Sequence, residues 1–181
     1  IDTYGADAVR FGIMVASPAG NDLMFDETAL EQGRNFNNKL WNALKLVKMW
    51  EARVADKNDT ADTNSFATDW FTNRLNQVKA EVEILMHQFR LSEALKTIYS
   101  LIWDDFCSWY LEWVKPGFEQ PIEASVYNST VAFFEELLQL LHPFMPFVSE
   151  EIYHLLRGQS TDLCVTQYGP TMIADVPVLQ Q

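Results

Sequence analysis

The sequence predicts an all-α protein, an antiparallel helix bundle. Apolar residues recur three and four positions apart along most of the chain, which is the spacing of helices that bury one face. They make up 48% of the 181 residues and include 6 Trp, 12 Phe and 6 Tyr, so a large core can form. Only 7 Gly and 7 Pro occur, too few for the many turns of an all-β chain. Short loops between the helical segments favour antiparallel neighbours.

The first two helices are expected at about 4–16 and 26–52. A break at 17–22 separates them, because this segment contains a proline and a glycine. Asp26 is a suitable N-cap for the second helix, since its carboxylate can accept hydrogen bonds from the free N–H groups of the first turn. The polar segment 56–65 follows, and we expect it to be a protease-sensitive loop.

The third and fourth helices are expected at about 68–89 and 93–114, each with apolar residues at helical spacing. Ser92 is the expected N-cap of the fourth helix, because its hydroxyl can accept a backbone hydrogen bond. Residues 115–117 include a proline and a glycine, so they should end this helix.

The fifth helix is expected at about 124–141. Pro143 and Pro146 prevent its smooth continuation, because each lacks an N–H and restricts the residue before it. A short sixth helix is expected at about 147–156. Gly158 should end it, since glycine tolerates the left-handed conformation that often follows a helix.

The net charge argues against strong binding to nucleic acids. The chain carries 25 acidic and 13 basic residues, a net charge of −12, whereas such affinity depends largely on phosphate contacts with Lys and Arg. The distribution of charge weakens this objection, because residues 32–50 contain no acid but do contain Arg34, Lys39, Lys45 and Lys48. A basic stretch on an acidic body would bind only part of a nucleic acid, and weakly.

Asparagines and lysines share one face of the second helix. Asn is a mediocre helix former, because its side chain competes for backbone hydrogen bonds. It offers both a donor and an acceptor, and Lys offers a mobile positive charge, which is the chemistry for contacting base edges beside phosphates. The alternative is that these side chains are solvated or form hydrogen bonds between helices. The candidate nucleic-acid contacts on this face are Asn35, Asn38, Lys39, Asn42 and Lys45.

No catalytic or metal-binding motif accompanies this face. The sequence lacks H-E-x-x-H, C-x-x-C, G-x-x-x-x-G-K-[ST] and G-x-G-x-x-G. Glu150 and His154 are one helical turn apart, but a metal site would need a further ligand. His142 is expected to hydrogen-bond free carbonyls at the end of the fifth helix. We therefore expect no catalytic residue, metal or cofactor in this chain.

The two cysteines, Cys107 and Cys164, are far apart in sequence. We expect them to be reduced in a cytoplasmic protein, with Cys107 an inert thiol buried among aromatic residues. No apolar run approaches the ~20 residues that a bilayer span needs, so no membrane partner is expected. The chain lacks an initiator Met, and we interpret it as a fragment.

Three motifs resemble the class I aminoacyl-tRNA synthetases specific for valine, isoleucine and leucine. Residues 2–11, D-T-Y-G-A-D-A-V-R-F, are similar to the Y-G-A-D-A-L-R-F segment that follows the K-M-S-K-S loop. Residues 142–152, H-P-F-M-P-F-V-S-E-E-I, are similar to H-P-F-M-P-F-x-T-E-E-I, with Ser149 in place of Thr and Tyr153 in place of the following Trp. Residues 34–43, R-N-F-N-N-K-L-W-N-A, resemble the helix that begins the anticodon-binding bundle of valyl-tRNA synthetases.

The resemblance implies a helical region that follows a catalytic domain absent from this chain. Residues 1–25 would be a junction helix, 26–158 the anticodon-binding bundle, and 159–181 a tail in which 164–166 is extended. The parent enzyme, expected to be monomeric, would attach valine to tRNA(Val) with ATP and Mg²⁺. The chain alone should be inactive, because it lacks the H-I-G-H and K-M-S-K-S motifs that bind ATP in this family.

The polar residues of the second helix are therefore the expected contacts with the anticodon arm of tRNA(Val). Tyr4, Asp7 and Arg10 are expected at the junction with the catalytic domain, and the alternative for them is packing of the first helix. Two other functions stay open. One is the same domain of an isoleucyl or leucyl enzyme, against which the asparagines argue, and the other is a helical scaffold that binds proteins through acidic faces.

Overall fold

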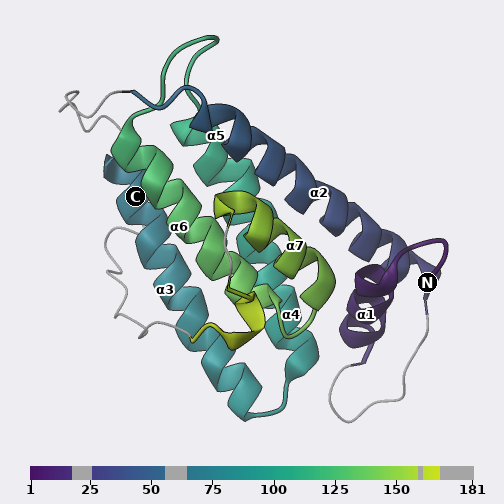
Figure 1. Cartoon of the computed structure of the whole chain (residues 1–181). Helices are drawn as coiled ribbons and strands as arrows, with labels where there is room; N and C mark the ends of the chain where they lie inside the picture. Colours follow the sequence, from purple (N-terminus) through teal and green to yellow (C-terminus); the bar gives the residue numbers. More distant parts are fainter. Residues whose placement is uncertain (18–25, 56–64, 159–160, 168–181) are drawn as a thin grey trace.

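Successive long helices run in opposite directions, as the colours along the chain show in Figure 1. The structure is a computed structural model that describes residues 1–17, 26–55, 65–158 and 161–167, and these contain no β-strand, only an isolated bridge. The expected all-α bundle is confirmed. The elements are α1 Ala6–Val15, α2 Glu27–Glu51, α3 Ser65–His87, α4 Leu91–Ser100, the π-helix η1 Leu101–Tyr110, α5 Leu111–Val114, α6 Ala124–Leu141, α7 Pro146–Arg157 and the 3-10 helix η2 Leu163–Val165.

Several helix ends follow the expected local signals. Asp26 caps α2, because its Oδ1 accepts a hydrogen bond from the backbone N–H of Thr28 at 2.9 Å. The bounds of α6 are those expected from the sequence, and Pro143 lies just beyond its end. Gly158 ends α7 in the left-handed conformation, with φ of 61°.

The fourth expected helix differs in two respects. It is continuous from α4 through α5, but its middle, η1, is a π-helix. Apolar spacing did not reveal this, because ten residues rich in aromatic side chains fit an α-helix or a π-helix equally well. Ser92 is not the N-cap; Arg90 holds that position without a capping bond, and the Ser92 hydroxyl donates to the Val15 carbonyl at 3.0 Å. This bond joins α4 to the end of α1.

Other local expectations are also corrected. α3 ends at His87 rather than near residue 89, where Phe89 has a φ of 57°. Residues 163–165 form η2, so the expected extended conformation holds for Thr166 but not for the two residues before it. The buried side chain of Leu163 accounts for this turn, because it is anchored against the core.

Parts of the expected loops and tail cannot be compared with the structure. Residues 18–25, 56–64, 159–160 and 168–181 lie outside the described residues. The protease-sensitive loop at 56–65 stays a prediction except at Ser65, which is the first residue of α3, three positions before the expected start of that helix. The division of the chain at residues 25 and 158 also stays a prediction.

Aromatic side chains tie three helices together in the core. Phe71 of α3 lies 5.3 Å from Phe106 of η1, 5.0 Å from Tyr110 and 5.0 Å from Phe133 of α6, measured between ring centroids. The Tyr110 hydroxyl lies 2.9 Å from Thr130 Oγ1, which satisfies two buried polar groups. Because burying each such ring contributes about 1.5–3 kcal/mol, this cluster fixes η1 against α3 and α6.

α1 packs across the start of α2 (Figure 1) and so determines what surrounds the polar residues of that helix. The approach is close at Gly33 of α2, where a Cβ atom would lie 2.8 Å from the carbonyl oxygen of Ala8. Phe11 of α1 packs against Phe36 of α2 with ring centroids 5.7 Å apart. Both rings are buried, so α1 is part of the same core as α2.

Candidate nucleic-acid interface

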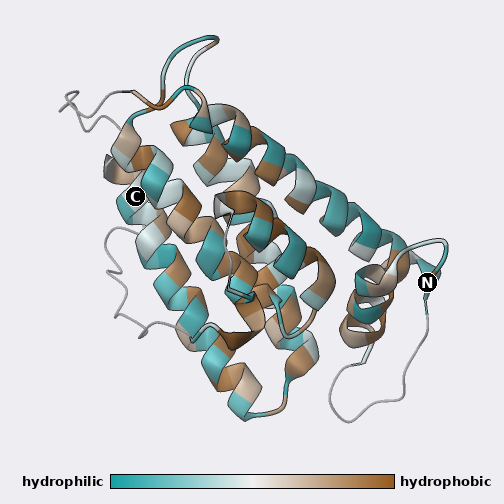
Figure 2. Cartoon of the chain, viewed as in Figure 1, coloured by the Kyte–Doolittle hydropathy of each residue, from teal (hydrophilic) through white to brown (hydrophobic). Residues whose placement is uncertain are grey.

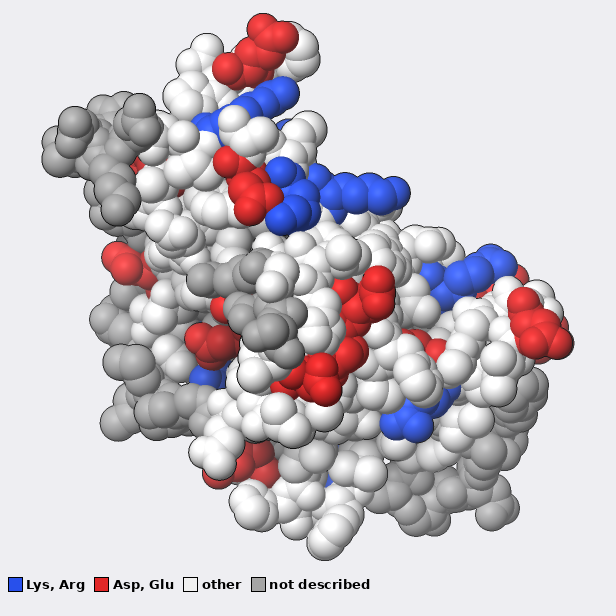
Figure 3. Space-filling view, viewed as in Figure 1, with Lys and Arg blue, Asp and Glu red and all other residues white. Residues whose placement is uncertain are grey.

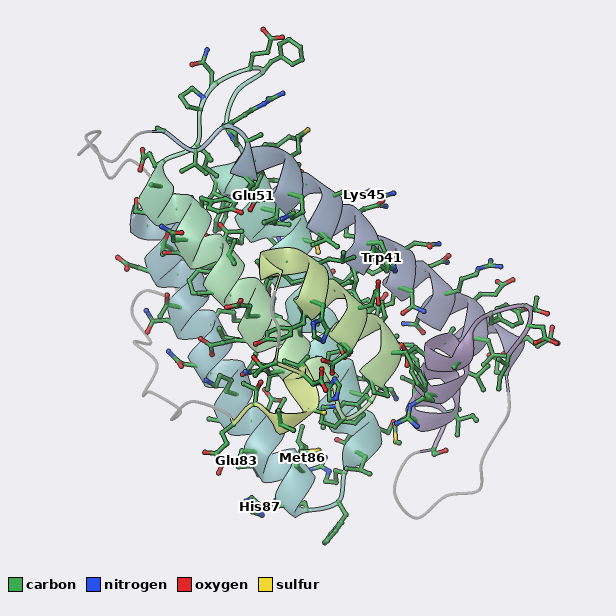
Figure 4. All side chains as sticks on the ribbon, viewed as in Figure 1. Trp41, Lys45, Glu51, Glu83, Met86 and His87 are labelled. Atoms are coloured by element: carbon green, nitrogen blue, oxygen red, sulfur yellow. The ribbon has the colours of Figure 1, made fainter. Side chains whose placement is uncertain are left out.

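The residues Asn35, Asn38, Lys39, Asn42 and Lys45, called the polar face below, lie together along the outer side of α2. All are exposed except Lys39, which is half-buried at the edge of the group. Figure 2 shows the outer side of α2 as hydrophilic, and Figure 4 shows Lys45 pointing away from the bundle. The opposite side of α2 is buried and apolar, with Phe36, Leu40, Ala43, Leu44 and Val47 in the core.

The asparagines of the polar face form no bond to another helix that the structure describes. Asn35, Asn38 and Asn42 make no side-chain hydrogen bond to any residue in the described part of the chain. Hydrogen bonds between helices, the alternative for these residues, are therefore absent within the described part of the chain. Solvation and binding of a ligand are the remaining roles.

The lysines of the polar face carry charge that no carboxylate of the described residues neutralises. Within the described residues, neither Lys39 nor Lys45 has an acidic oxygen within the 4.0 Å of an ion pair. Lys39 Nζ instead lies 5.1 Å from the ring centroid of Trp103 on η1. Other lysines of the chain do form ion pairs, namely Lys48 with Glu51, Lys79 with Glu136 and Lys115 with Glu112.

Arg34 extends the positive charge toward α1. It is exposed, and its guanidinium carbon lies 5.5 Å from the ring centroid of Tyr4, one of the expected junction residues. Figure 3 shows Lys and Arg side chains along the edge that α2 forms, while Asp and Glu side chains gather over α6 and α7. The acidic surface of the bundle is thus largely separate from the polar face.

A fourth asparagine of α2, Asn37, lies off the polar face. Its side chain is half-buried, and its Oδ1 atom is buried without a hydrogen-bond partner among the described residues. Leaving such an acceptor unpaired costs about 1–3 kcal/mol. The spacing of the asparagines separated this residue from the other three correctly.

Asp7 and Arg10, two of the expected junction residues, hold α1 to the turn between α6 and α7. The Asp7 carboxylate accepts hydrogen bonds from the backbone N–H of Val148 at 2.6 Å and of Phe147 at 3.4 Å, in the first turn of α7. Arg10 donates from Nε to the Phe144 carbonyl at 3.0 Å, and from Nη2 to the carbonyl of Pro143 at 3.2 Å. The packing role is therefore present, while a junction with a catalytic domain stays a prediction.

The Asp7 carboxyl is an interior group with opposing influences on its pKa. Burial raises the pKa above the ordinary value of 3.8, and the hydrogen bonds from Val148 and Phe147 and the charge of Arg10 lower it in part. Two of the three motifs that resemble the synthetases, at 2–11 and 142–152, thus meet in one contact. Nothing in the spacing of these motifs predicts that they are in contact.

Histidines lie between carboxylates near the end of α7. His154 Nε2 lies 3.0 Å from Glu150 Oε1 and 3.3 Å from Asp162 Oδ1, so Asp162 is a third candidate ligand that sequence spacing did not reveal. Glu150 Oε1 also accepts a hydrogen bond from the N–H of Leu163 at 2.6 Å. These contacts are hydrogen bonds and ion pairs that form without a metal, although the three side chains are close enough to share one. The expected absence of a metal site therefore stays a prediction.

His142 does not cap α6 through carbonyl groups, contrary to expectation. Its Nδ1 lies 2.9 Å from the hydroxyl oxygen of Ser149, which in turn donates to the Met145 carbonyl at 2.8 Å. The serine found where the resembling motif has threonine therefore supplies the polar partner. The reason is that α7 begins so soon after α6 that its first turn lies within reach of the imidazole.

Cys107 is buried, as expected, and desolvation raises the pKa of its thiol to about 12. A thiol with this pKa is protonated at neutral pH and is a poor nucleophile. Cys164 is exposed. None of the described helices combines the length and the hydropathy needed to cross a membrane.

Comparison with known proteins agrees with this architecture. Residues 68–177 match the family described as the anticodon-binding domain of tRNA ligase, which is more than half of the chain. The chain belongs to this family. The polar face lies on α2, outside the matched residues, so family membership alone does not assign its role.

The curated proteins that this chain resembles are valine–tRNA ligases. The chain is 52% identical to that of Porphyromonas gingivalis over 169 residues, which is 91% of this chain and 19% of the relative. It is 49% identical to the valine–tRNA ligase of Parabacteroides distasonis, over 97% of this chain and 20% of the relative. It is 51% identical to the valine–tRNA ligase of Bacteroides fragilis, over 100% of this chain and 21% of the relative. The chain thus spans about a fifth of the length of the curated relatives it matches.

Proposed function

We propose that the polar face binds the anticodon arm of tRNA(Val). The observation that supports this most directly is the pair Lys39 and Lys45 beside three exposed asparagines. Within the described residues, the lysines have no acidic partner and the asparagine side chains have no hydrogen-bond partner. Membership in the anticodon-binding family supplies the class of ligand.

Each residue type has a distinct part in this binding. Lysine ammonium groups contact phosphates, which give affinity without sequence preference. Asparagine can pair with a base edge through two hydrogen bonds, and unpaired bases of an RNA loop expose such edges. Asn35, Asn38 and Asn42 would therefore read the anticodon while Lys39 and Lys45 hold the backbone.

The acidic body limits the size of the interface. Two lysines, with Arg34 beside them, would neutralise about two to three phosphates, so log K should fall with log salt with a slope of about −2 to −3. A net charge of −12 makes wider contact with a polyanion unfavourable. The proposal is thus a small, salt-sensitive contact confined to one edge of the bundle.

The whole protein would be an enzyme that attaches valine to tRNA(Val). The names of the relatives support valine over isoleucine or leucine. ATP with Mg²⁺ would bind in a catalytic region outside this chain, and the protein would act as a monomer in the cytoplasm. The anticodon arm would be held by this chain while the acceptor end is charged elsewhere.

Binding of a tRNA transcript with a valine anticodon tests the proposal, measured at several salt concentrations in the full-length protein that carries this chain. Lys39→Ala and Lys45→Ala should each weaken binding of all tRNAs and reduce the salt slope by about one unit. Asn35→Ala, Asn38→Ala or Asn42→Ala should cost about 1–3 kcal/mol for the valine anticodon and less for an altered one, if that contact is bidentate.

The matched control is Lys96→Ala, which removes one exposed positive charge from α4. It should change neither affinity nor salt slope. If Lys39→Ala and Lys45→Ala behave like this control, the polar face is only a solvated surface and the proposed function is wrong for it.

A further inference from the structure

Lys39 differs from the other lysines in what holds its ammonium group. Lys48, Lys79 and Lys115 lie against carboxylates, which neutralise their charge. Lys39 lies over the face of Trp103 instead. Its positive charge also lowers the pKa of the Cys107 thiol in part, against the effect of burial. Because Trp103 and Cys107 both belong to η1, the Lys39 side chain lies along the surface of η1. A ring face attracts a cation without accepting a full hydrogen bond, so the ammonium keeps its charge and its donors.

Trp103 is itself firmly placed. Its ring stacks on Tyr99 of α4 with centroids 5.5 Å apart and planes inclined by 21°. Tyr99 in turn contacts Phe11 and Phe36, at 5.7 and 4.9 Å. The indole thus stands at the end of an aromatic row that reaches into the core between α1 and α2.

The backbone under Trp103 is also unusual. Trp103 belongs to the π-helix η1, and its carbonyl accepts a hydrogen bond from the Ser108 hydroxyl, five residues later, at 2.8 Å. π-Helical segments are rare and occur frequently at functional sites. Trp103 therefore stands on a segment whose backbone differs from an ordinary α-helix.

We propose that Trp103 is a positioning residue for the polar face: its ring holds the Lys39 ammonium, which has no acidic partner among the described residues, at the edge of that face. This inference rests on the proposed function. A lysine already held in place loses less side-chain freedom when it binds a phosphate, so the ring strengthens binding without touching the RNA. The partner is a phosphate of the anticodon arm.

Two other roles for Trp103 predict different behaviour. If the indole served only the core, its removal would destabilise the protein and affect tRNA binding regardless of Lys39. If an RNA base stacked on the indole directly, its removal would weaken binding even after Lys39 was gone. Only the positioning role makes the effect of Trp103 depend on Lys39.

A double-mutant cycle in the full-length protein tests this dependence. The variants are Lys39→Ala, Trp103→Leu and the two together, with affinity measured for a valine tRNA transcript at low and high salt. Trp103→Leu should weaken binding roughly two- to fivefold, the strength of one exposed cation–π contact. In the Lys39→Ala background it should have no further effect, and Trp103→Phe, which keeps a ring, should restore most of the loss.

Trp70→Leu is the matched control, because Trp70 is a half-buried tryptophan on α3 that contacts Trp113 rather than a lysine. It should leave tRNA affinity unchanged, and circular dichroism should show each variant folded. If Lys39→Ala weakens binding but Trp103→Leu has no effect, or an equal effect in both backgrounds, the positioning role is overturned and the proposed function stands. If neither Lys39→Ala nor Lys45→Ala has an effect, both fail.

Discussion

Replacing Asp7 by Ala should destabilise the protein through the start of α7. The change removes the acceptor of the Val148 N–H at 2.6 Å and of the Phe147 N–H at 3.4 Å, and it takes a charge away from Arg10. Asp7 is 4% exposed, so water cannot easily replace the carboxylate. The effect reports on how α1 is attached to the rest of the bundle.

The magnitude follows from the contacts that are lost. An N-cap contributes about 0.5–2 kcal/mol, and a buried N–H left unpaired costs about 1–3 kcal/mol. Removal of a poorly solvated charge offsets part of this, so we expect a loss of about 1–3 kcal/mol at pH 7. Asp7→Asn keeps one acceptor oxygen in a side chain of the same shape, and it should cost less.

The dependence on pH has a definite sign. Burial raises the pKa of Asp7 above 3.8 in the folded protein, so its contribution to stability is full below 3.8 and decreases as pH rises through the folded pKa. The exposed cap Asp26 is the contrast, because hydrogen bonds from Thr28 lower its pKa. Its contribution is present above 3.8 and is lost as pH falls through the folded pKa.

Urea unfolding followed by circular dichroism measures both effects, at pH 7 and pH 3.5, on either side of the pI of about 4.5. The destabilisation caused by Asp7→Ala should be larger at pH 3.5 than at pH 7, and that caused by Asp26→Ala should be smaller. An Asp7→Ala penalty that shrinks at pH 3.5 would show that the carboxylate is favoured in its ionised form, and the account of its burial would be wrong.

Three further predictions concern the core, the cysteines and catalysis. Thr130→Val should lower the free energy of unfolding, measured in urea, by about 1 kcal/mol, because the Tyr110 hydroxyl loses one hydrogen-bond partner but keeps Thr68. An unchanged free energy of unfolding would contradict the bond between Tyr110 and Thr130. Cys164 should react with a thiol reagent at pH 8 in the folded protein and Cys107 should not; equal rates would refute this. The chain alone should show no valine-dependent ATP–pyrophosphate exchange, and detectable exchange would overturn that expectation.

Local signals in the sequence were sufficient for most helices. The bounds of α6 and the end of α7 at Gly158 could be predicted because prolines, a glycine and a regular apolar stripe act on neighbouring residues. The exposed polar face could be predicted for the same reason, since α2 keeps one helical period over 25 residues. On a single long helix, the number of positions between two residues determines whether their side chains lie on the same face.

Contacts between distant segments could not be predicted in this way. Asp7 and Val148 are 141 positions apart, and no periodicity indicates that one will cap the helix of the other. Nothing in the apolar spacing of its helix indicates that Trp103 lies over Lys39, because that position depends on how η1 lies beside α2. The π-helical turn of η1 was likewise not predicted, and its rings pack against Phe71 of α3 and Phe134 of α6.

The attachment of α1 to the turn between α6 and α7 bears on how the protein can be dissected by deletion. A shortened chain that began at α2 would leave the backbone N–H of Val148 without its acceptor, Asp7. It would also expose core residues such as Phe36 that Phe11, 1% exposed, now covers. Loss of tRNA binding in such a chain would then report an unfolded bundle rather than a missing contact. The smallest piece suited to mapping the RNA interface must therefore begin before Asp7, although the residues that match the family begin only at 68.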